Sequence, residues 1–408
     1  MKSKEFSKSA FLVSRGAFIS QVLMLGFTPV LSRIYAPEHF GALSVFTGVT
    51  AIFALIFTLK YELAIVLPAE HNTAFQVMKL TILISLGLSF VFFLLLLLFV
   101  NAFSLLSDNK IYIFFLPLST FLIGLFAALQ QWFLRNKNYK LISLAQIILA
   151  ATTIIINIIC ILLKNTHYGL IIGYIIGYIC ACIVLLVKLN LTKLSLKFSL
   201  LYSLASRYKE FPRFMILTAL LSTLSYQLIP LLIEYFYSTA EVGFFSIANR
   251  ILMLPTIVIG TAIGNVFRVE TSIMHNNNQD IRPLFRKVLK KQLLIGIPIF
   301  TSVAVVAPLM LTYVLGKQWY VAGIYTRYIS FMAFGFFLIQ PYNNIFIIKG
   351  KHEINMISQI CLICLIILTV YFGKLYLSSL TVVISILSVM IFFFLSLNIF
   401  ISYRVLKP

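Results

Sequence analysis

The chain has little charge, and acidic residues are its scarcest part. Of its 408 residues only 11% are charged, and 11 Asp and Glu stand against 32 Lys and Arg. Soluble globular proteins carry roughly 25% charged residues, so a water-soluble enzyme is excluded. Apolar residues take the place of the missing charge, since 61% of the chain is hydrophobic and 15% is aromatic. Most of the chain is therefore expected to lie in a lipid bilayer.

Motifs of nucleotide, metal and nucleophile chemistry are missing as well. The sequence has no Walker loop, dinucleotide fingerprint or nucleophile elbow, and its five His residues show no metal-ligand spacing. The five Cys residues fall in apolar stretches. Cys361 and Cys364 have no second pair and no neighbouring His, so free, buried and unreactive thiols are expected. We expect a protein that is not an enzyme and that binds no cofactor and no metal.

Twelve apolar stretches are long enough to cross a bilayer as helices of roughly 20 residues. This count predicts an all-α polytopic membrane protein. The twelve predicted spans are 16–31, 40–67, 77–103, 111–134, 141–163, 168–189, 214–233, 242–267, 293–315, 325–348, 354–372 and 377–403.

The distribution of basic residues predicts the orientation of these spans. If the N-terminus is cytoplasmic, the segments on that side hold 25 of the 32 Lys and Arg, and the outer segments hold seven. Such a bias follows the positive-inside rule. It predicts an even number of spans with both termini in the cytoplasm. Most of the net charge of +21 is then explained by topology, and no nucleic-acid partner is expected.

Short matches between the two halves indicate an internal repeat. Six spans per repeat is an even number, so both halves insert in the same direction, as in transporters whose substrate site lies between parallel repeats. The predicted division is an N-terminal lobe at 1–190, a basic cytoplasmic linker at 191–212 and a C-terminal lobe at 213–408. The matched segments are 29–35 with 230–236, 40–45 with 242–247, and 136–146 with 349–359.

Ionisable side chains inside a predicted span are the candidate functional residues, because a charge at mid-membrane costs about 2.5 kcal/mol or more. Arg250 lies about two helical turns inside its span, too deep to reach the surface easily, and is the best candidate for a cavity-lining cation. Lys60 and Glu62 lie at the inner end of the second span. Residues two apart on a helix do not face each other, so at least one should face another helix or water. Arg268 and Glu270 repeat this pattern.

Three further candidates lie at the ends of spans. Arg15 and Arg213 open the first and seventh spans at the inner face, where they serve either as substrate-binding cations or as topological anchors. Glu234 lies at the outer end of the seventh span, where solvation of the span end is one interpretation and a charged gate is another.

At these residues the chain resembles the Wzx-type flippases of lipid-linked oligosaccharides, within the MOP (multidrug, oligosaccharidyl-lipid, polysaccharide) superfamily. The resemblance implies a MATE-like fold of two six-helix lobes around a central cavity, lined chiefly by the first, second, seventh and eighth spans. The segments that give the resemblance are 31–41, 60–65, 208–212 and 242–255.

The resemblance also implies a substrate and a location. The substrate would be an undecaprenyl-diphosphate-linked oligosaccharide, such as an O-antigen unit of lipopolysaccharide, moved from the cytoplasmic to the periplasmic leaflet of the bacterial inner membrane by alternating access. Arg and Lys suit a diphosphate. Expected partners are this lipid-linked glycan, the bilayer, and the polysaccharide polymerase and chain-length machinery. The implied substrate cations are Arg250, Arg15, Lys60, Arg213 and Arg268, and the candidates for ion coupling or charge pairing are Glu62, Glu234 and Glu270.

Three other functions stay open at this point. A MATE-type cation or drug antiporter would share the fold but needs an acidic cavity, whereas the deepest charge here is Arg250. A membrane polysaccharide polymerase or ligase uses the same class of lipid-linked substrate but usually carries an extended outer loop, which the outer segments do not provide. A lipid II flippase usually has more spans than are found here.

Overall fold

The computed structural model is built almost entirely of helices. It describes residues 3–98, 110–164, 168–189, 198–349, 351–377 and 379–406, and these contain no β-strand. Eleven helical segments among them are long and apolar enough to cross a membrane, and each overlaps one of the last eleven predicted spans. The first predicted span overlaps helix α1 (Ser3–Gly26) and the short α2 (Thr28–Ser32). The prediction of an all-α polytopic membrane protein is confirmed.

The chain divides into two compact units. The first comprises Met1–Tyr35 and Val45–Thr223, and the second comprises Ala36–Ser44 and Leu224–Pro408. The predicted lobe limits were set by the order of the spans along the chain, whereas these two units are defined by which residues pack together. Residues 36–44 group with the second unit for this reason. The limits of the two lobes and of the linker therefore remain a prediction, and residues 190–197 of the linker region lie outside the described residues.

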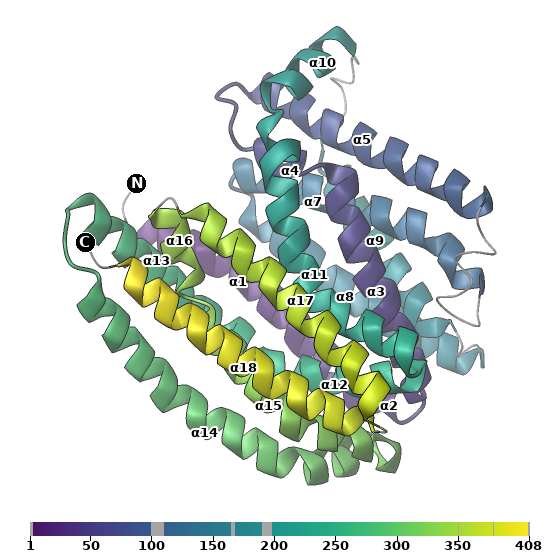
Figure 1. The fold of residues 1–408 in the computed structure, drawn as a ribbon. Coiled ribbons are helices and arrows are strands. Elements are labelled where there is room, and N and C mark those ends of the chain that lie inside the picture. Colours follow the sequence, from purple (N-terminus) through teal and green to yellow (C-terminus); the bar gives the residue numbers. More distant parts are fainter. Residues whose placement is uncertain are drawn as a thin grey trace. The chain divides into compact units, whose positions relative to one another are not determined.

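The first unit is a bundle in which neighbouring helices pack in pairs. Helix α1 lies along α8, α8 along α9, and α5 along α7 (Figure 1). Its core contains Ile65, Met78 and Trp132, all nearly inaccessible to solvent. Besides α1 and α2, its described elements are α3 (Pro37–Thr58, from Val45), α4 (Tyr61–Ala64), α5 (His71–Leu98), η2 (Lys110–Phe115), α7 (Leu116–Arg135), α8 (Tyr139–Leu162), α9 (Gly169–Val187), α10 (Phe198–Arg207), η4 (Phe211–Met215) and the start of α11 (Ile216–Phe236).

Helix α10 is the amphipathic part of the predicted linker region. Leu201 and Leu204 are buried in the core of the first unit, whereas Tyr202 is exposed. The hydroxyl of Tyr61 donates a hydrogen bond of 3.0 Å to the carbonyl of Ala205. These contacts hold one face of α10 against the bundle.

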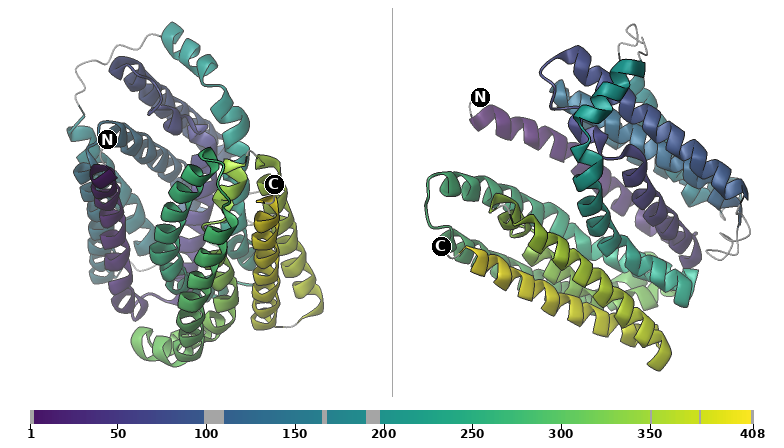
Figure 2. Two further views of the ribbon diagram at one scale, coloured as in Figure 1. Left: turned by 90° about the vertical axis from the view of Figure 1, so that its left-hand side faces the viewer. Right: turned by 45° about the horizontal axis from the view of Figure 1, so that its top comes forward.

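The second unit is organised around a central helix, α15, which packs against α12, α14 and α18. Helices α17 and α18 form an antiparallel pair that both further views show (Figure 2). Helix α14 curves along its length (Figure 1), and it contains Pro298 and Pro308, which cannot donate to the helical ladder. Besides the last part of α11, the elements are α12 (Thr239–Pro255), η5 (Thr256–Gly260), α13 (Thr261–Asn276), α14 (Arg282–Leu315), η6 (Lys317–Trp319), α15 (Tyr320–Ile339), α16 (Asn343–Ile348), α17 (His352–Tyr376) and α18 (Leu380–Val405).

The predicted tenth span, 325–348, is interrupted. Helix α15 ends at Ile339 and α16 begins at Asn343. Pro341 lies between them and has no backbone N–H to continue the ladder. The apolar run continues through this break, which is why hydropathy alone joined the two helices into one span.

The starts of α3 and α12 meet at two glycines that the internal repeat makes equivalent. A Cβ atom on Gly41 would lie 1.8 Å from the carbonyl oxygen of Thr239, and one on Gly243 would lie 1.9 Å from that of Pro37. Pro37 and Thr239 are separated by the same number of residues as Gly41 and Gly243. The contact is therefore the same when it is described from either helix. This equivalence of Gly41 and Gly243 agrees with the internal repeat.

Candidate functional site

Arg250 lies in α12, in the second unit. It follows Thr239, the first residue of the helix, by eleven positions, which is about 16 Å along the axis. Its side chain is half-buried, and no described residue forms a hydrogen bond or an ion pair with it. A guanidinium so far inside a candidate span without an acidic partner needs water or an anionic ligand.

The helix around Arg250 is irregular just beyond it. Pro255 ends α12, and the π-helical turn η5 follows before α13 continues the same span. A second π-helical turn, η4, contains Pro212 and Arg213 at the start of the seventh span. Proline removes a backbone donor, and π-helical turns are frequent at functional sites in helices. Among the described residues, the seventh and eighth spans are thus the two that contain a π-helical turn.

Lys60 and Glu62 form an ion pair of 3.3 Å in the first unit, with side chains that are 16% and 7% exposed. The prediction that residues two apart cannot face each other is wrong here because the helix is broken. Helix α3 ends at Thr58, and Leu59 and Lys60 adopt left-handed backbone conformations, with φ of 48° and 60°, before α4 begins. The second oxygen of the Glu62 carboxylate, Oε2, is buried and has no hydrogen-bond partner among the described residues.

The similar pair in the second unit does not meet. Arg268 and Glu270 lie on the continuous helix α13, and both side chains are exposed. No ion pair between them is present in the described part of the chain, as their spacing of two on a regular helix predicts. These two residues therefore remain candidates by position only.

The remaining candidates lie at helix ends or surfaces. Arg15 in α1 is exposed. Arg213 is also exposed, and its guanidinium stacks over the neighbouring ring of Phe214 at 5.2 Å. Glu234 is half-buried and accepts a hydrogen bond of 2.8 Å from the hydroxyl of Thr239, across the turn between α11 and α12. Of the candidates taken from the sequence, the structure joins only Lys60 with Glu62 within the described residues. Roles of all eight in substrate binding or ion coupling stay predictions.

A polar recess in the second unit was not among the candidates. We call it the amide recess; it measures about 370 Å³, counting the space open at its mouth. Helices α11, α17 and α18, with the end of α15 and the start of α16, contribute its walls. Its lining residues are Ser225, Tyr226, Phe336, Ile339, Asn343, Ser358, Gln359, Leu362, Leu395 and Asn398.

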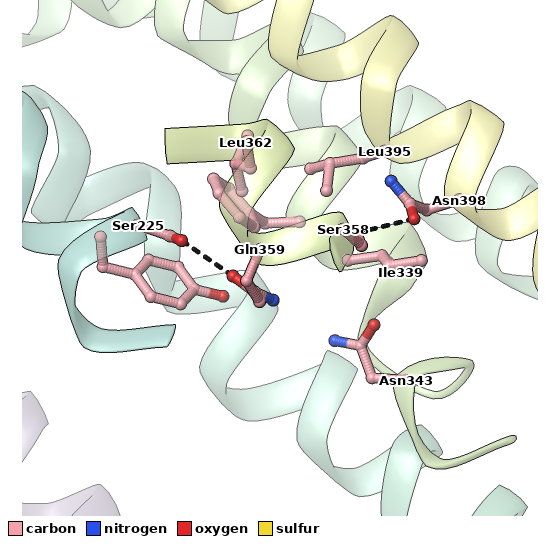
Figure 3. Close-up of a pocket in the computed structure, with 10 residues that line it drawn as sticks. Ser225, Ile339, Asn343, Ser358, Gln359, Leu362, Leu395 and Asn398 are labelled. Atoms are coloured by element: carbon pink, nitrogen blue, oxygen red, sulfur yellow. Dashed lines mark hydrogen bonds between the residues drawn. The ribbon is translucent and has the colours of Figure 1, made fainter. Parts of the chain in front are cut away.

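Two hydrogen bonds tie the walls of the amide recess together (Figure 3). The hydroxyl of Ser225 donates to Oε1 of Gln359 at 2.8 Å, and the hydroxyl of Ser358 donates to Oδ1 of Asn398 at 2.7 Å. The amide nitrogen of Gln359 and the side chain of Asn343 face the same open space. The candidates taken from the sequence are charged residues, and no charged side chain lines this recess. The isolated Ser, Asn and Gln within apolar runs were the available signal.

The cysteines are free, as predicted, but only Cys160 and Cys182 are buried, Cys180 is half-buried, and the other two are exposed. All five thiols are unpaired. Cys361 and Cys364 are exposed on α17, because they lie on the face of the helix that no other described helix covers. Among the described residues there is no group of three His, Cys, Asp or Glu that could hold a metal ion.

A family of polysaccharide biosynthesis proteins matches residues 30–323, which is more than half of the chain and spans both units. No curated protein matches the chain.

Solved structures with a similar fold are membrane transporters. An inward-facing multidrug resistance MATE family transporter of the MOP superfamily has a TM-score of 0.71 at 14% identity, covering 96% of this chain and 99% of that chain. The lipid II flippase MurJ, in an inward closed conformation, has a TM-score of 0.76 at 16% identity, covering 97% of this chain and 87% of that chain. The MATE multidrug transporter DinF-BH has a TM-score of 0.67 at 15% identity, covering 100% and 97%. The MATE-like fold expected from the sequence is confirmed.

Proposed function

Because the chain belongs to the polysaccharide biosynthesis protein family of the MOP superfamily, we propose that it is a flippase for lipid-linked oligosaccharides. It moves an undecaprenyl-diphosphate-linked repeat unit, of O-antigen or a related surface polysaccharide, from the cytoplasmic to the periplasmic leaflet of the bacterial inner membrane. Transport proceeds by alternating access and involves no catalysis. Both chain termini lie in the cytoplasm, and the polysaccharide polymerase and chain-length machinery receive the product.

The observation that supports this proposal most is the isolated cation in α12. Arg250 is half-buried inside a candidate span and has no acidic partner among the described residues. A diphosphate is an anion that a guanidinium binds through two parallel hydrogen bonds. It supplies the counter-charge that Arg250 otherwise lacks inside the membrane. Lys60, paired with Glu62, has no such need for an anionic ligand.

Substitution of Arg250 tests the proposal. Arg250→Ala should reduce surface polysaccharide more than tenfold, while Arg250→Lys should restore part of it, since Lys keeps the charge but loses the paired hydrogen bonds. Surface polysaccharide is measured by gel staining in a deletion strain that expresses each variant, with membrane insertion checked by immunoblot. Arg404→Ala is the matched control, because Arg404 is an exposed cation at the end of α18 and stacks on Phe400. Full activity of inserted Arg250→Ala would remove Arg250 from the site.

A cation or drug antiporter is the second function to separate by experiment, since the similar solved structures include MATE transporters. Antiport of a cation favours a carboxylate in the binding cavity, and neither Arg250 nor the uncharged amide recess provides one. Deletion of the gene should therefore remove surface glycan and accumulate lipid-linked units on the cytoplasmic side. Normal glycan together with altered drug sensitivity would instead support the antiporter. Coupling to protons or sodium through Glu62, Glu234 or Glu270 stays a hypothesis within this proposal.

A further inference from the structure

The amide recess brings uncharged polar groups together inside the membrane region. Gln359 lies seven residues after His352 at the start of α17, and Asn398 lies seven residues before Val405 at the end of α18. Because the two helices are antiparallel, both side chains lie about 10 Å from the same end of the pair. Burying polar groups at such a depth costs free energy unless the groups form hydrogen bonds.

The side chains of the amide recess have more hydrogen-bond donors and acceptors than the structure pairs. Ser225 donates to Oε1 of Gln359, and Ser358 donates to Oδ1 of Asn398. Within the described residues, the amide nitrogen of Gln359 and the side-chain amide of Asn343 have no hydrogen-bond partner. A side-chain amide offers two donors on nitrogen and an acceptor on oxygen. The recess therefore offers donors and acceptors to a ligand that has both.

An aromatic face completes the recess. Tyr226 is 49% exposed, and its ring packs against that of Phe336 at 4.9 Å with a tilt of 34°, which fixes the orientation of the pair. Binding sites for small molecules commonly combine such apolar walls with a few well-placed polar groups.

The chemistry of the lining selects among the parts of a lipid-linked glycan. No carboxylate, ammonium or guanidinium lies among the ten lining residues, so neither a diphosphate nor a cationic drug finds a counter-charge there. A hydrocarbon tail has no group that could form a hydrogen bond with the unpaired amides of Gln359 and Asn343. A sugar ring has hydroxyls that both donate and accept, and it has an apolar face that can lie on an aromatic ring.

We propose that the amide recess binds an uncharged sugar residue of the transported glycan, through Gln359, Asn343 and the ring of Tyr226. This inference rests on the proposed flippase function and divides the recognition between two places. Arg250 binds the diphosphate common to all such lipids, and the recess distinguishes glycosylated lipid from bare lipid. A site built to hydrogen-bond a hydroxyl rejects ligands that lack it.

Binding to two lipid probes tests the proposal. The full chain in lipid nanodiscs is titrated with synthetic undecaprenyl diphosphate and, separately, with the lipid-linked saccharide pool extracted from its native cells. Bound fractions are measured by native mass spectrometry. Gln359→Leu and Asn343→Leu should each weaken binding of the saccharide pool about five- to tenfold, the effect of one lost hydrogen bond to a ligand, and leave undecaprenyl diphosphate binding unchanged. Arg250→Ala should weaken both.

Controls separate the possible failures. Gln279→Leu makes the same chemical change at an exposed position outside the recess and should change neither affinity. If Gln359→Leu does not fold because the Ser225 bond is lost, Asn343→Leu carries the test, since Asn343 makes no side-chain hydrogen bond to the described residues. Equal losses for both probes, or no loss for either, would overturn the sugar site alone. Wild-type protein that binds neither probe would overturn the proposed function as well.

Discussion

The two units contain the same basic-x-acidic motif in different surroundings. In the first unit Lys60 and Glu62 form an ion pair of 3.3 Å, whereas in the second unit Arg268 and Glu270 are both exposed and do not pair within the described residues. The difference lies in the backbone, because the first motif follows a left-handed break and the second lies on a regular helix. The meaning of such a motif therefore depends on whether the helix continues through it.

The units also differ in how equivalent helices pack. The first span, which comprises α1 and α2, and the seventh span, α11, correspond in the internal repeat, as do the starts of α8 and α17. Helix α1 lies directly against α8, since a Cβ atom on Gly16 would lie 2.5 Å from the Cα of Ser143. In the described part of the chain no helix packs comparably along α11, which reaches α17 through the hydrogen bond between Ser225 and Gln359. The looser packing leaves room for the amide recess.

The largest expected effect concerns the reciprocal glycine contact, where the two repeats should behave alike. Gly41→Ala and Gly243→Ala each place a methyl group within 2 Å of a backbone carbonyl oxygen, and backbone atoms cannot move aside as a flexible side chain can. Each variant should lower the free energy of unfolding by about 3 kcal/mol, measured as a loss of thermal stability of the purified protein in detergent.

The control for this prediction is Gly87→Ala on α5, where an added Cβ meets no atom within 4 Å. Alanine there should be neutral or stabilising by up to about 1 kcal/mol, because glycine is unfavourable in a helix. A large effect at only one of Gly41 and Gly243 would show that the two positions are not equivalent.

The second prediction separates the paired acid from the unpaired one. Glu62→Leu leaves Lys60 nearly buried without its counter-charge, which should cost about 2 to 3 kcal/mol of stability. Glu270→Leu removes an exposed carboxylate with no partner among the described residues and should change stability by less than about 0.5 kcal/mol. Both are measured by thermal unfolding in the same detergent. The double variant Lys60→Met, Glu62→Leu should recover part of the loss. Equal effects of the two single variants would show that the ion pair contributes no stability.

The sequence predicted more of the fold than of the site, for physical reasons. Spans follow from apolar runs of sufficient length, so eleven of them matched helices with ends within a few residues in most cases. A short break inside an apolar run leaves no hydropathy signal, so the breaks at Leu59 and Pro341 were missed. Whether Lys60 meets Glu62 depends on that break.

The sequence also identified only some of the candidate site residues. Arg250 could be identified because a charge inside an apolar run is conspicuous, and the structure leaves it without a described partner. The amide recess could not be assembled, because Ser225, Asn343, Gln359 and Asn398 come from four helices and meet only through tertiary packing. Sequence spacing relates residues on one helix, and it does not relate residues on different helices.

The smallest expected effect compares two helix ends of the same geometry. Lys137, two residues after the end of α7, has a φ of 55°, and the N–H of Asn138 donates to the carbonyl of Phe133 at 2.9 Å. Asn278, two residues after the end of α13, has a φ of 54°, and the N–H of Gln279 donates to the carbonyl of Met274 at 2.8 Å. Both are Schellman caps, in which the left-handed residue is usually Gly or Asn.

The Cβ atom of lysine crowds the following carbonyl oxygen in this conformation, whereas the short polar side chain of asparagine tolerates it by hydrogen bonding locally. Lys137→Gly should therefore stabilise the protein by about 0.5 to 1 kcal/mol, and Asn278→Gly should have almost no effect. Thermal unfolding of the two variants in parallel gives the difference directly. Both positions lie at exposed helix ends, so packing cannot account for a difference in stability between the two variants. Equal changes in thermal stability would mean that the left-handed conformation of Lys137 causes no strain.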